Sequence, residues 1–153
     1  MTLTVKIVDV QPFVQYQDTV YEYKVVVNFE NTIFGVFDPD MYANPNMIGE
    51  IYDIEIAPFT PTSVELPEDI NFGIIPNSED PRGISGHTYC GEVSSISEGW
   101  PKFIDINMMP GTVTIKFYQT TPEEINYRDD LKEVSVGDMI RVTTTRTDLR
   151  RLE

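Results

Sequence analysis

Residues 20–29 read VYEYKVVVNF, and this stretch decides the fold class of the chain. Its odd-numbered positions carry aromatic or aliphatic side chains, whereas Glu22, Lys24 and Asn28 occupy even-numbered positions. Alternation with a period of two places apolar side chains on one face of a β-strand, whereas a helix has a period of about 3.6. The stretch therefore predicts a half-buried strand.

The same rhythm recurs along most of the chain. It predicts strands over residues 2–10, 32–37, 49–56, 72–75, 89–97, 103–108, 112–118 and 139–145. A helix is predicted only over residues 122–133, where a threonine cap, a proline and two glutamates begin it. We therefore expect a mainly β protein, a small β-barrel or two fused small β-units, with one short α-helix near residues 122–133.

The element order of the C-terminal half resembles the OB-fold, a small β-barrel. Residues 89–145 give strand, strand, strand, helix and strand, and a Val-Gly-Asp turn at 136–138 precedes the last strand. In the OB-fold the helix lies between the third and fourth strands. A fifth strand is missing from this stretch, so either N-terminal strands complete the sheet or the resemblance ends there.

The length of 153 residues suits a single compact domain, residues 1–153. The alternation is lost over residues 58–86, which hold five of the eleven prolines. This Pro-rich segment is either an ordered meander or a join between subunits 1–57 and 87–153. Residues 47–54 and 135–142 share a pattern of apolar residue, glycine, acid and alternating strand, which a duplication or a common turn type would explain.

Acidic residues dominate the charge. Twenty-five Asp and Glu against eleven Lys and Arg give −14, and residues 1–100 alone carry −13. Such a chain is repelled as a whole by nucleic acids and anionic membranes, so contact with a polyanion requires a local basic patch. The acidic surface has three explanations: solubility, adaptation to high salt, or a face that meets a basic partner or mimics a nucleic acid.

One cysteine and one histidine exclude an intramolecular disulfide and zinc sites built mainly from these residue types. The N-terminus lacks the pattern of a signal peptide, and no apolar run approaches the length of a membrane span. We expect a cytoplasmic protein with no membrane contact.

Three catalytic or metal-binding patterns fail on their spacing. His87 and Cys90 would point to opposite faces of a strand, so a loop histidine and a small buried cysteine are expected. Residues 83–87 break the Gly-x-Ser-x-Gly pattern of serine hydrolases at its last position. The oxygen-rich run from Asp38 to Glu50 departs from an EF-hand loop, and its side chains are expected to cap turns.

The best candidate site combines basic and aromatic residues of the C-terminal half. Its predicted binding residues are Trp100, Lys102, Lys116, Tyr118, Arg141, Arg146 and Arg150, with Phe103 nearby in the sequence. Aromatic rings beside cations hold single-stranded nucleic acids in OB-type barrels. The competing interpretation is ion pairing to Asp105, Asp129, Asp130 and Asp138, with the aromatic rings in the core.

We therefore expect a non-catalytic binding or adaptor module without a cofactor or metal. A protein partner is the first expectation, and single-stranded nucleic acid, bound through the C-terminal half, is the second. Two alternatives remain open: an acidic inhibitor or nucleic-acid mimic that binds a basic partner, and a metal-dependent hydrolase built from carboxylates. The sequence does not predict the oligomeric state.

Overall fold

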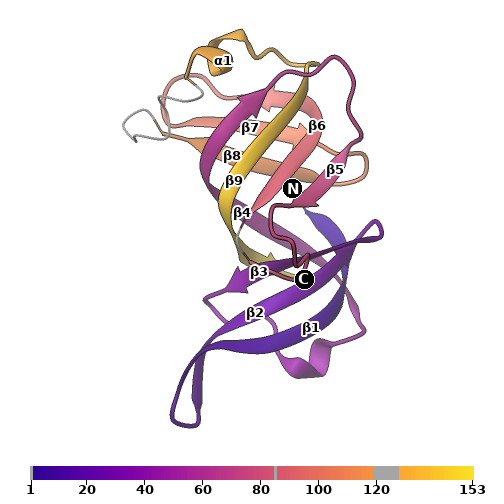
Figure 1. The fold of residues 1–153 in the computed structure, drawn as a ribbon, viewed down its shortest axis with the longest axis vertical. Helices are drawn as coiled ribbons and strands as arrows, with labels where there is room; N and C mark the ends of the chain where they lie inside the picture. The colour runs from indigo at the N-terminus through magenta and orange to yellow at the C-terminus, as the bar shows by residue number, and fades with distance from the viewer. Residues whose placement is uncertain (1, 85, 119–127) are drawn as a thin grey trace.

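The computed structural model describes residues 2–84, 86–118 and 128–153. The described chain is mainly β, as predicted, and forms two lobes (Figure 1). Its strands are β1 (Leu3–Tyr16), β2 (Thr19–Phe29), β3 (Thr32–Asp38), β4 (Ile51–Glu65), β5 (Gly73–Pro76), β6 (His87–Ile96), β7 (Lys102–Asn107), β8 (Thr112–Phe117) and β9 (Met139–Leu152). A 3-10 turn, η1 (Pro45–Met47), and one short helix, α1 (Arg128–Glu133), complete the described elements.

The first lobe is a closed barrel of five strands. β1, β2 and β3 form an antiparallel meander, β4 pairs with β1, and β9 pairs with β4. A parallel contact between Phe37 of β3 and Asp148 of β9 closes the ring. The apolar faces of these strands fill the barrel, because Val27, Phe34 and Ile54 are fully buried.

The second lobe repeats this arrangement with the later strands. β6, β7 and β8 form an antiparallel meander, and β9 pairs with β6. β4 pairs with β9 and lies along β8, although no ladder joins β4 to β8 among the described residues. Among the described residues, the strands of this lobe therefore leave a seam between β4 and β8. Buried Ile104, Ile115 and Ile140 form part of its core.

The two lobes are joined by two long strands. The β4–β9 ladder runs from Ile54 opposite Leu152 to Glu65 opposite Arg141, so each strand contributes to both lobes. β4 thus occupies residues 58–65 of the Pro-rich segment, where we had expected no regular strand. The expected brief strand near 72–75 is present as β5, which pairs with β6.

Equivalent turns precede the two long strands. Before β4, the Gly49 amide donates to the Ile7 carbonyl (2.8 Å) and the Ile7 amide to the Glu50 carbonyl (2.9 Å). Before β9, the Gly137 amide donates to the Val93 carbonyl (2.8 Å) and the Val93 amide donates to the Asp138 carbonyl (2.9 Å). Both glycines have positive φ, +90° and +96°. The similar segments at 47–54 and 135–142 therefore make the same turn, while their origin by duplication stays a prediction.

Each predicted strand corresponds to one strand of the described residues, whereas the 3-10 turn η1 was not predicted. α1 lies inside the predicted helix 122–133, while residues 119–127 are outside the described part of the chain. β6 contains a bulge, because its pairing with β7 shifts register between Val93 and Ser95. No helix among the described residues is long and apolar enough to cross a membrane.

Candidate binding site: a cation–aromatic cleft between the lobes

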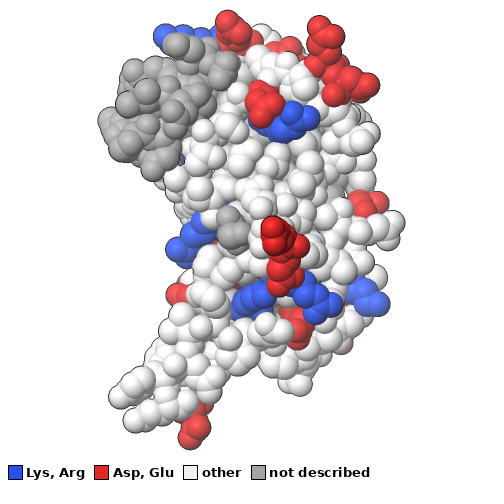
Figure 2. Space-filling view, in the orientation of Figure 1, with Lys and Arg blue, Asp and Glu red and all other residues white. Residues whose placement is uncertain are grey.

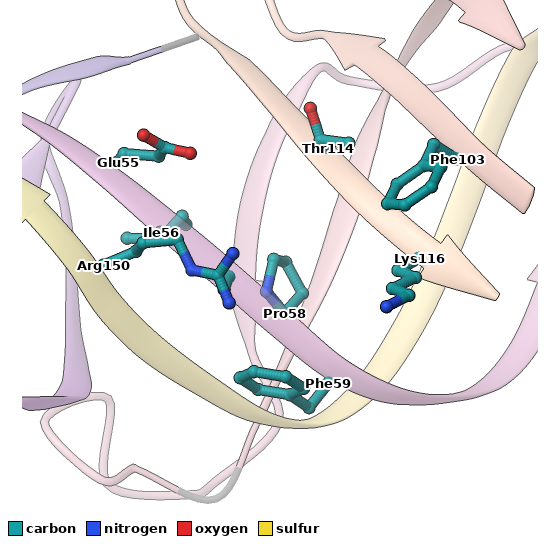
Figure 3. A pocket seen from close by; sticks show the side chains of 9 residues that line it. Glu55, Ile56, Pro58, Phe59, Phe103, Thr114, Lys116 and Arg150 are labelled. Carbon is teal, nitrogen blue, oxygen red and sulfur yellow. The ribbon is translucent and has the colours of Figure 1, made fainter. Parts of the chain in front are cut away.

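A cleft of about 220 Å³ opens at the seam between β4 and β8 (Figure 3). β4 forms one wall, β7 and β8 form the other, and β9 contributes one side chain. The lining residues are Glu55, Ile56, Ala57, Pro58, Phe59, Phe103, Thr114, Lys116 and Arg150. Lys116 and Arg150 belong to the basic–aromatic set predicted from the sequence, and the fold brings them to the same cavity.

Lys116 is held by two aromatic rings. It lies directly opposite Phe103 in the β7–β8 ladder, and both side chains point outward because Ile104 and Ile115 point into the core. Its ammonium nitrogen is 5.7 Å from the centre of the Phe103 ring and 4.8 Å from that of Tyr118. Such contacts stabilise a cation without neutralising its charge.

Arg150 owes its position to a bulge. The β4–β9 register shifts at this residue, because Glu55 pairs with Arg151 and Ile56 with Leu149. Arg150 is exposed, and neither it nor Lys116 forms an ion pair with a described residue. Glu55, the carboxylate of the cleft, is 3.9 Å from the guanidinium of Arg151. The cleft therefore holds two cations that no described carboxylate pairs with.

The loop before β7 adds a second cation–aromatic pair. The ammonium of Lys102 lies 5.6 Å from the Trp100 ring centre and donates to the Ser97 carbonyl at 3.5 Å. Because Lys102 lies opposite Phe117 at the end of the β7–β8 ladder, this pair is close to Tyr118. Trp100, Phe103 and Tyr118 are 37%, 40% and 39% exposed, so the prediction that these rings pack in the core is wrong.

The remaining predicted residues, Arg141 and Arg146, are ion-paired. Arg141 donates to Glu65 at 2.9 Å, at the end of β9 remote from the cleft. Arg146 binds Asp148 through two bonds of 2.7 and 3.2 Å, and this hydrogen bonding raises the pKa of the guanidinium. Arg146 nevertheless stays near the site, because it lines a neighbouring hollow with Phe59 and Asp148.

Ion pairing was thus expected correctly for these arginines, but their described partners are Glu65 and Asp148, and the side chains of Asp129 and Asp130 lie outside the described part of the chain. Asp105 does not pair with a described cation; it accepts from Thr114 (2.6 Å) and Ser95 (3.0 Å). Asp138 accepts from the Ser135 amide at 2.8 Å, within the turn before β9. Figure 2 shows basic side chains across the middle of the molecule, with acidic ones among them.

His87 and Cys90 do not form a catalytic pair. His87 is the first residue of β6 rather than a loop residue, and it is fully buried. Its Nδ1 atom is 2.9 Å from the Thr147 hydroxyl, its Nε2 atom has no partner among the described residues, and burial lowers its pKa to about 4. Cys90 is buried as predicted, and burial raises the pKa of its thiol.

The oxygen-rich run from Asp38 to Glu50 caps backbone groups. Asp38 is fully buried and accepts from the amides of Tyr42 (3.0 Å) and Ala43 (2.8 Å). Asn44 accepts from the Asn46 amide at 2.9 Å, at the start of η1. In the described part of the chain, no group of three or more His, Cys, Asp or Glu residues could hold a metal ion.

Sequence reasoning missed Phe59 and Phe37. Phe59 lies in the Pro-rich segment, which gave no strand pattern, yet it lines both the cleft and the neighbouring hollow. Phe37 ends a predicted strand, and its ring lies 4.6 Å beneath the Arg146 guanidinium. The local sequence carries no signal for either role, because each depends on the pairing of distant strands.

No protein-family model, curated protein or solved structure matches this chain.

Proposed function

We propose that this protein is a non-catalytic binding module whose ligand occupies the cleft between β4 and β8. The observation that carries this proposal is the pair of cations Lys116 and Arg150, which form no ion pair with a described residue and lie beside the rings of Phe59 and Phe103. Cations and rings in one cavity suit a ligand that has both negative charge and flat apolar groups.

Single-stranded nucleic acid fits this chemistry best. Phosphates carry the charge that Lys116 and Arg150 attract, and unpaired bases stack on exposed rings such as Phe103. The net charge of −14 opposes binding elsewhere on the molecule, so contact is restricted to this local patch. A short ligand segment and a steep dependence on salt concentration are the expected consequences.

The order of the strands supports the same ligand. In the second lobe β6, β7 and β8 are followed by α1 and β9, and β4 takes the place of the missing fifth strand beside β8 and β9. We propose that this lobe is an OB-like barrel. OB-folds bind oligonucleotides on the face of their second and third strands, which here are β7 and β8, the strands of Phe103 and Lys116.

A fluorescence anisotropy titration with a labelled oligothymidylate at low salt tests this proposal. Each neutralised phosphate contributes about −0.7 to the slope of log K against log salt for single strands. Two cations therefore predict a slope of about −1.4, and Lys116→Ala should reduce it to about −0.7. Phe103→Ala should weaken binding by about 1–3 kcal/mol, as expected for the loss of one stacked base.

Lys6→Ala is the matched control. Lys6 is an exposed lysine of β1 that does not line the cleft, so its substitution removes the same charge from another surface. Polyglutamate is the matched ligand, because it has negative charge without bases. Absence of binding at low salt, or equal losses for Lys6→Ala and Lys116→Ala, would refute the nucleic-acid proposal.

A protein adaptor is the second candidate, and the hairpin arm favours it. The arm, residues 11–22 of β1 and β2, projects from the first lobe as a two-stranded ribbon (Figure 1). Phe13, Val14, Tyr16 and Tyr21 are 47%, 42%, 68% and 53% exposed along it. Adjacent exposed apolar side chains of this size often mark a protein interface. The acidic excess of residues 1–100 suits a partner with a basic rim.

Affinity capture from the source organism tests the adaptor role. The double variant Tyr16→Ser/Tyr21→Ser should lose the captured protein, while Lys116→Ala should keep it, because the arm and the cleft use different residues. Both tyrosines are exposed, so thermal unfolding should show an unchanged midpoint for the double variant. An identical set of captured proteins for the wild type and the double variant would exclude the arm as the docking surface.

A further inference from the structure

The cleft is the middle of a longer row of side chains. Five neighbouring strands, β7, β8, β4, β9 and β3, each place one side chain on the same outer surface. In that order the residues are Phe103, Lys116, Phe59, Arg146 and Phe37. Aromatic rings and cations alternate along the row. The row begins on the second lobe, crosses the junction of the two lobes at β4 and β9, and ends on the first lobe.

Contacts or shared cavities link each member of the row to the next. Phe103 and Lys116 are a directly opposed pair, and both line the cleft with Phe59. Phe59 lies directly opposite Arg146 in the β4–β9 ladder, so their side chains share a face. The Arg146 guanidinium lies 4.6 Å from the centre of the Phe37 ring.

The row ends on the first lobe with an extra ring. Phe37 packs edge-on against Phe13 at 4.9 Å between ring centres, and Phe13 is 47% exposed at the base of the hairpin arm. The Arg146 guanidinium donates two hydrogen bonds to the Asp148 carboxylate, which hold it over the Phe37 ring. A guanidinium plane held on a ring is a stacking surface for a base.

We propose that the row is one continuous track for single-stranded nucleic acid that spans both lobes. This inference rests on the proposed function, because it extends the ligand of the cleft onto the first lobe. Hydrogen-bonded strands lie about 4.8 Å apart, so five strands span roughly 19 Å, and the cleft between β8 and β4 makes this length a lower bound. At about 3.4 Å per stacked nucleotide, about six nucleotides cover the row and about three cover its β7–β8–β4 part.

Carboxylates weaken the attraction for phosphates at the end of the row that lies on the first lobe. Asp148 is bound to Arg146, Glu22 acts on Arg146 through space, and Glu55 lies in the cleft. Stacking on Phe37 and Arg146 therefore contributes more than charge at this end, whereas Lys116 and Arg150 supply the attraction for phosphates. The two ends should consequently respond to different substitutions.

Anisotropy titrations with oligothymidylates of three and twelve nucleotides test the track. Phe37→Leu removes the ring but keeps an apolar side chain, and should weaken the twelve-nucleotide ligand about tenfold while leaving the shorter one unchanged. Phe103→Leu should weaken both. Asp148→Asn should tighten the longer ligand about threefold, the effect of one like charge about 7 Å away in water. Glu68→Gln, an exposed residue outside the row, is its charge-matched control.

The outcomes separate the two proposals. If neither oligonucleotide binds the wild type, the proposed function and the track both fail. If the wild type binds both but Phe37→Leu and Asp148→Asn leave the twelve-nucleotide affinity unchanged, the track is overturned and the cleft remains the site. Asp148→Asn decides the matter if Phe37→Leu lowers the thermal midpoint enough to prevent the measurement.

Discussion

The free energy of unfolding should depend on pH through His87, the only histidine of the chain. His87 is fully buried between the lobes, where its ring lies 5.1 Å from that of Phe34 and 6.2 Å from that of Tyr89. Burial disfavours the charged imidazolium and lowers the pKa from 6.5 to about 4. In the unfolded chain the same side chain is solvated and keeps a pKa of about 6.5.

The direction of the effect follows from proton binding. Between pH 6.5 and 4 the unfolded chain binds a proton at His87 that the folded protein does not bind, so acidification favours unfolding. The contribution of neutral His87 is fully present above pH 6.5 and is lost as the pH falls towards 4. With about 1.4 kcal/mol per pKa unit, the free energy of unfolding should fall by about 3 kcal/mol over this interval.

Urea unfolding at a series of pH values from 7.5 down to 4 measures this loss, and His87→Gln is the control because glutamine does not titrate. Burial also raises the pKa of Asp38, which acts in the opposite direction, but Asp38 is present in both proteins and cancels in the difference. The ¹³C–¹H signal of the single imidazole gives the folded pKa directly. A folded pKa at or above 6.5, or equal pH dependence in both proteins, would refute the reasoning.

Three further predictions concern the fold. Gly86→Ala should destabilise the protein by about 2 kcal/mol or more, since its β-carbon would lie 2.3 Å from the Thr144 carbonyl oxygen; Gly99→Ala, with positive φ but open space, should cost less in thermal unfolding. Cys90 should resist iodoacetamide at pH 8 until urea unfolds the chain, because its thiol is buried and its pKa is raised; rapid labelling of the folded protein would contradict this. Calorimetry should show one cooperative transition, because β4 and β9 belong to both lobes, and two separate transitions would argue against shared strands.

The sequence was sufficient for the strands that serve one lobe. β7 and β8 keep strict alternation of buried and less buried positions, because one face of each points into a single core, whereas β2 and β3 each bury three consecutive residues. The predicted strands 49–56 and 139–145 end earlier than β4 and β9 do, because these two long strands change the face that is buried. In β4 the change occurs near Thr60, which has φ of +54°, and the ladder shifts register between Pro61 and Ser63. Pro58 and Pro61 reinforced the impression of a loop.

The candidate site was predictable only in part. Lys116 and Tyr118 share an outward strand face, so their proximity follows from the two-residue period, and Phe103 needed only the neighbouring β7–β8 turn. Arg150 reaches the cleft through a bulge, and Phe59 and Phe37 through pairings with β9 that span much of the chain. Long-range pairing of this kind has no local sequence signature.

Amide chemical-shift mapping with a twelve-nucleotide oligothymidylate tests the central claim, that rings and cations on neighbouring strands form the binding surface, most directly. We expect shifts along the outer positions of β7, β8, β4, β9 and β3, largest around Phe103, Lys116 and Phe59, and fading as salt is added. Shifts confined to the hairpin arm, or none at low salt, would contradict it.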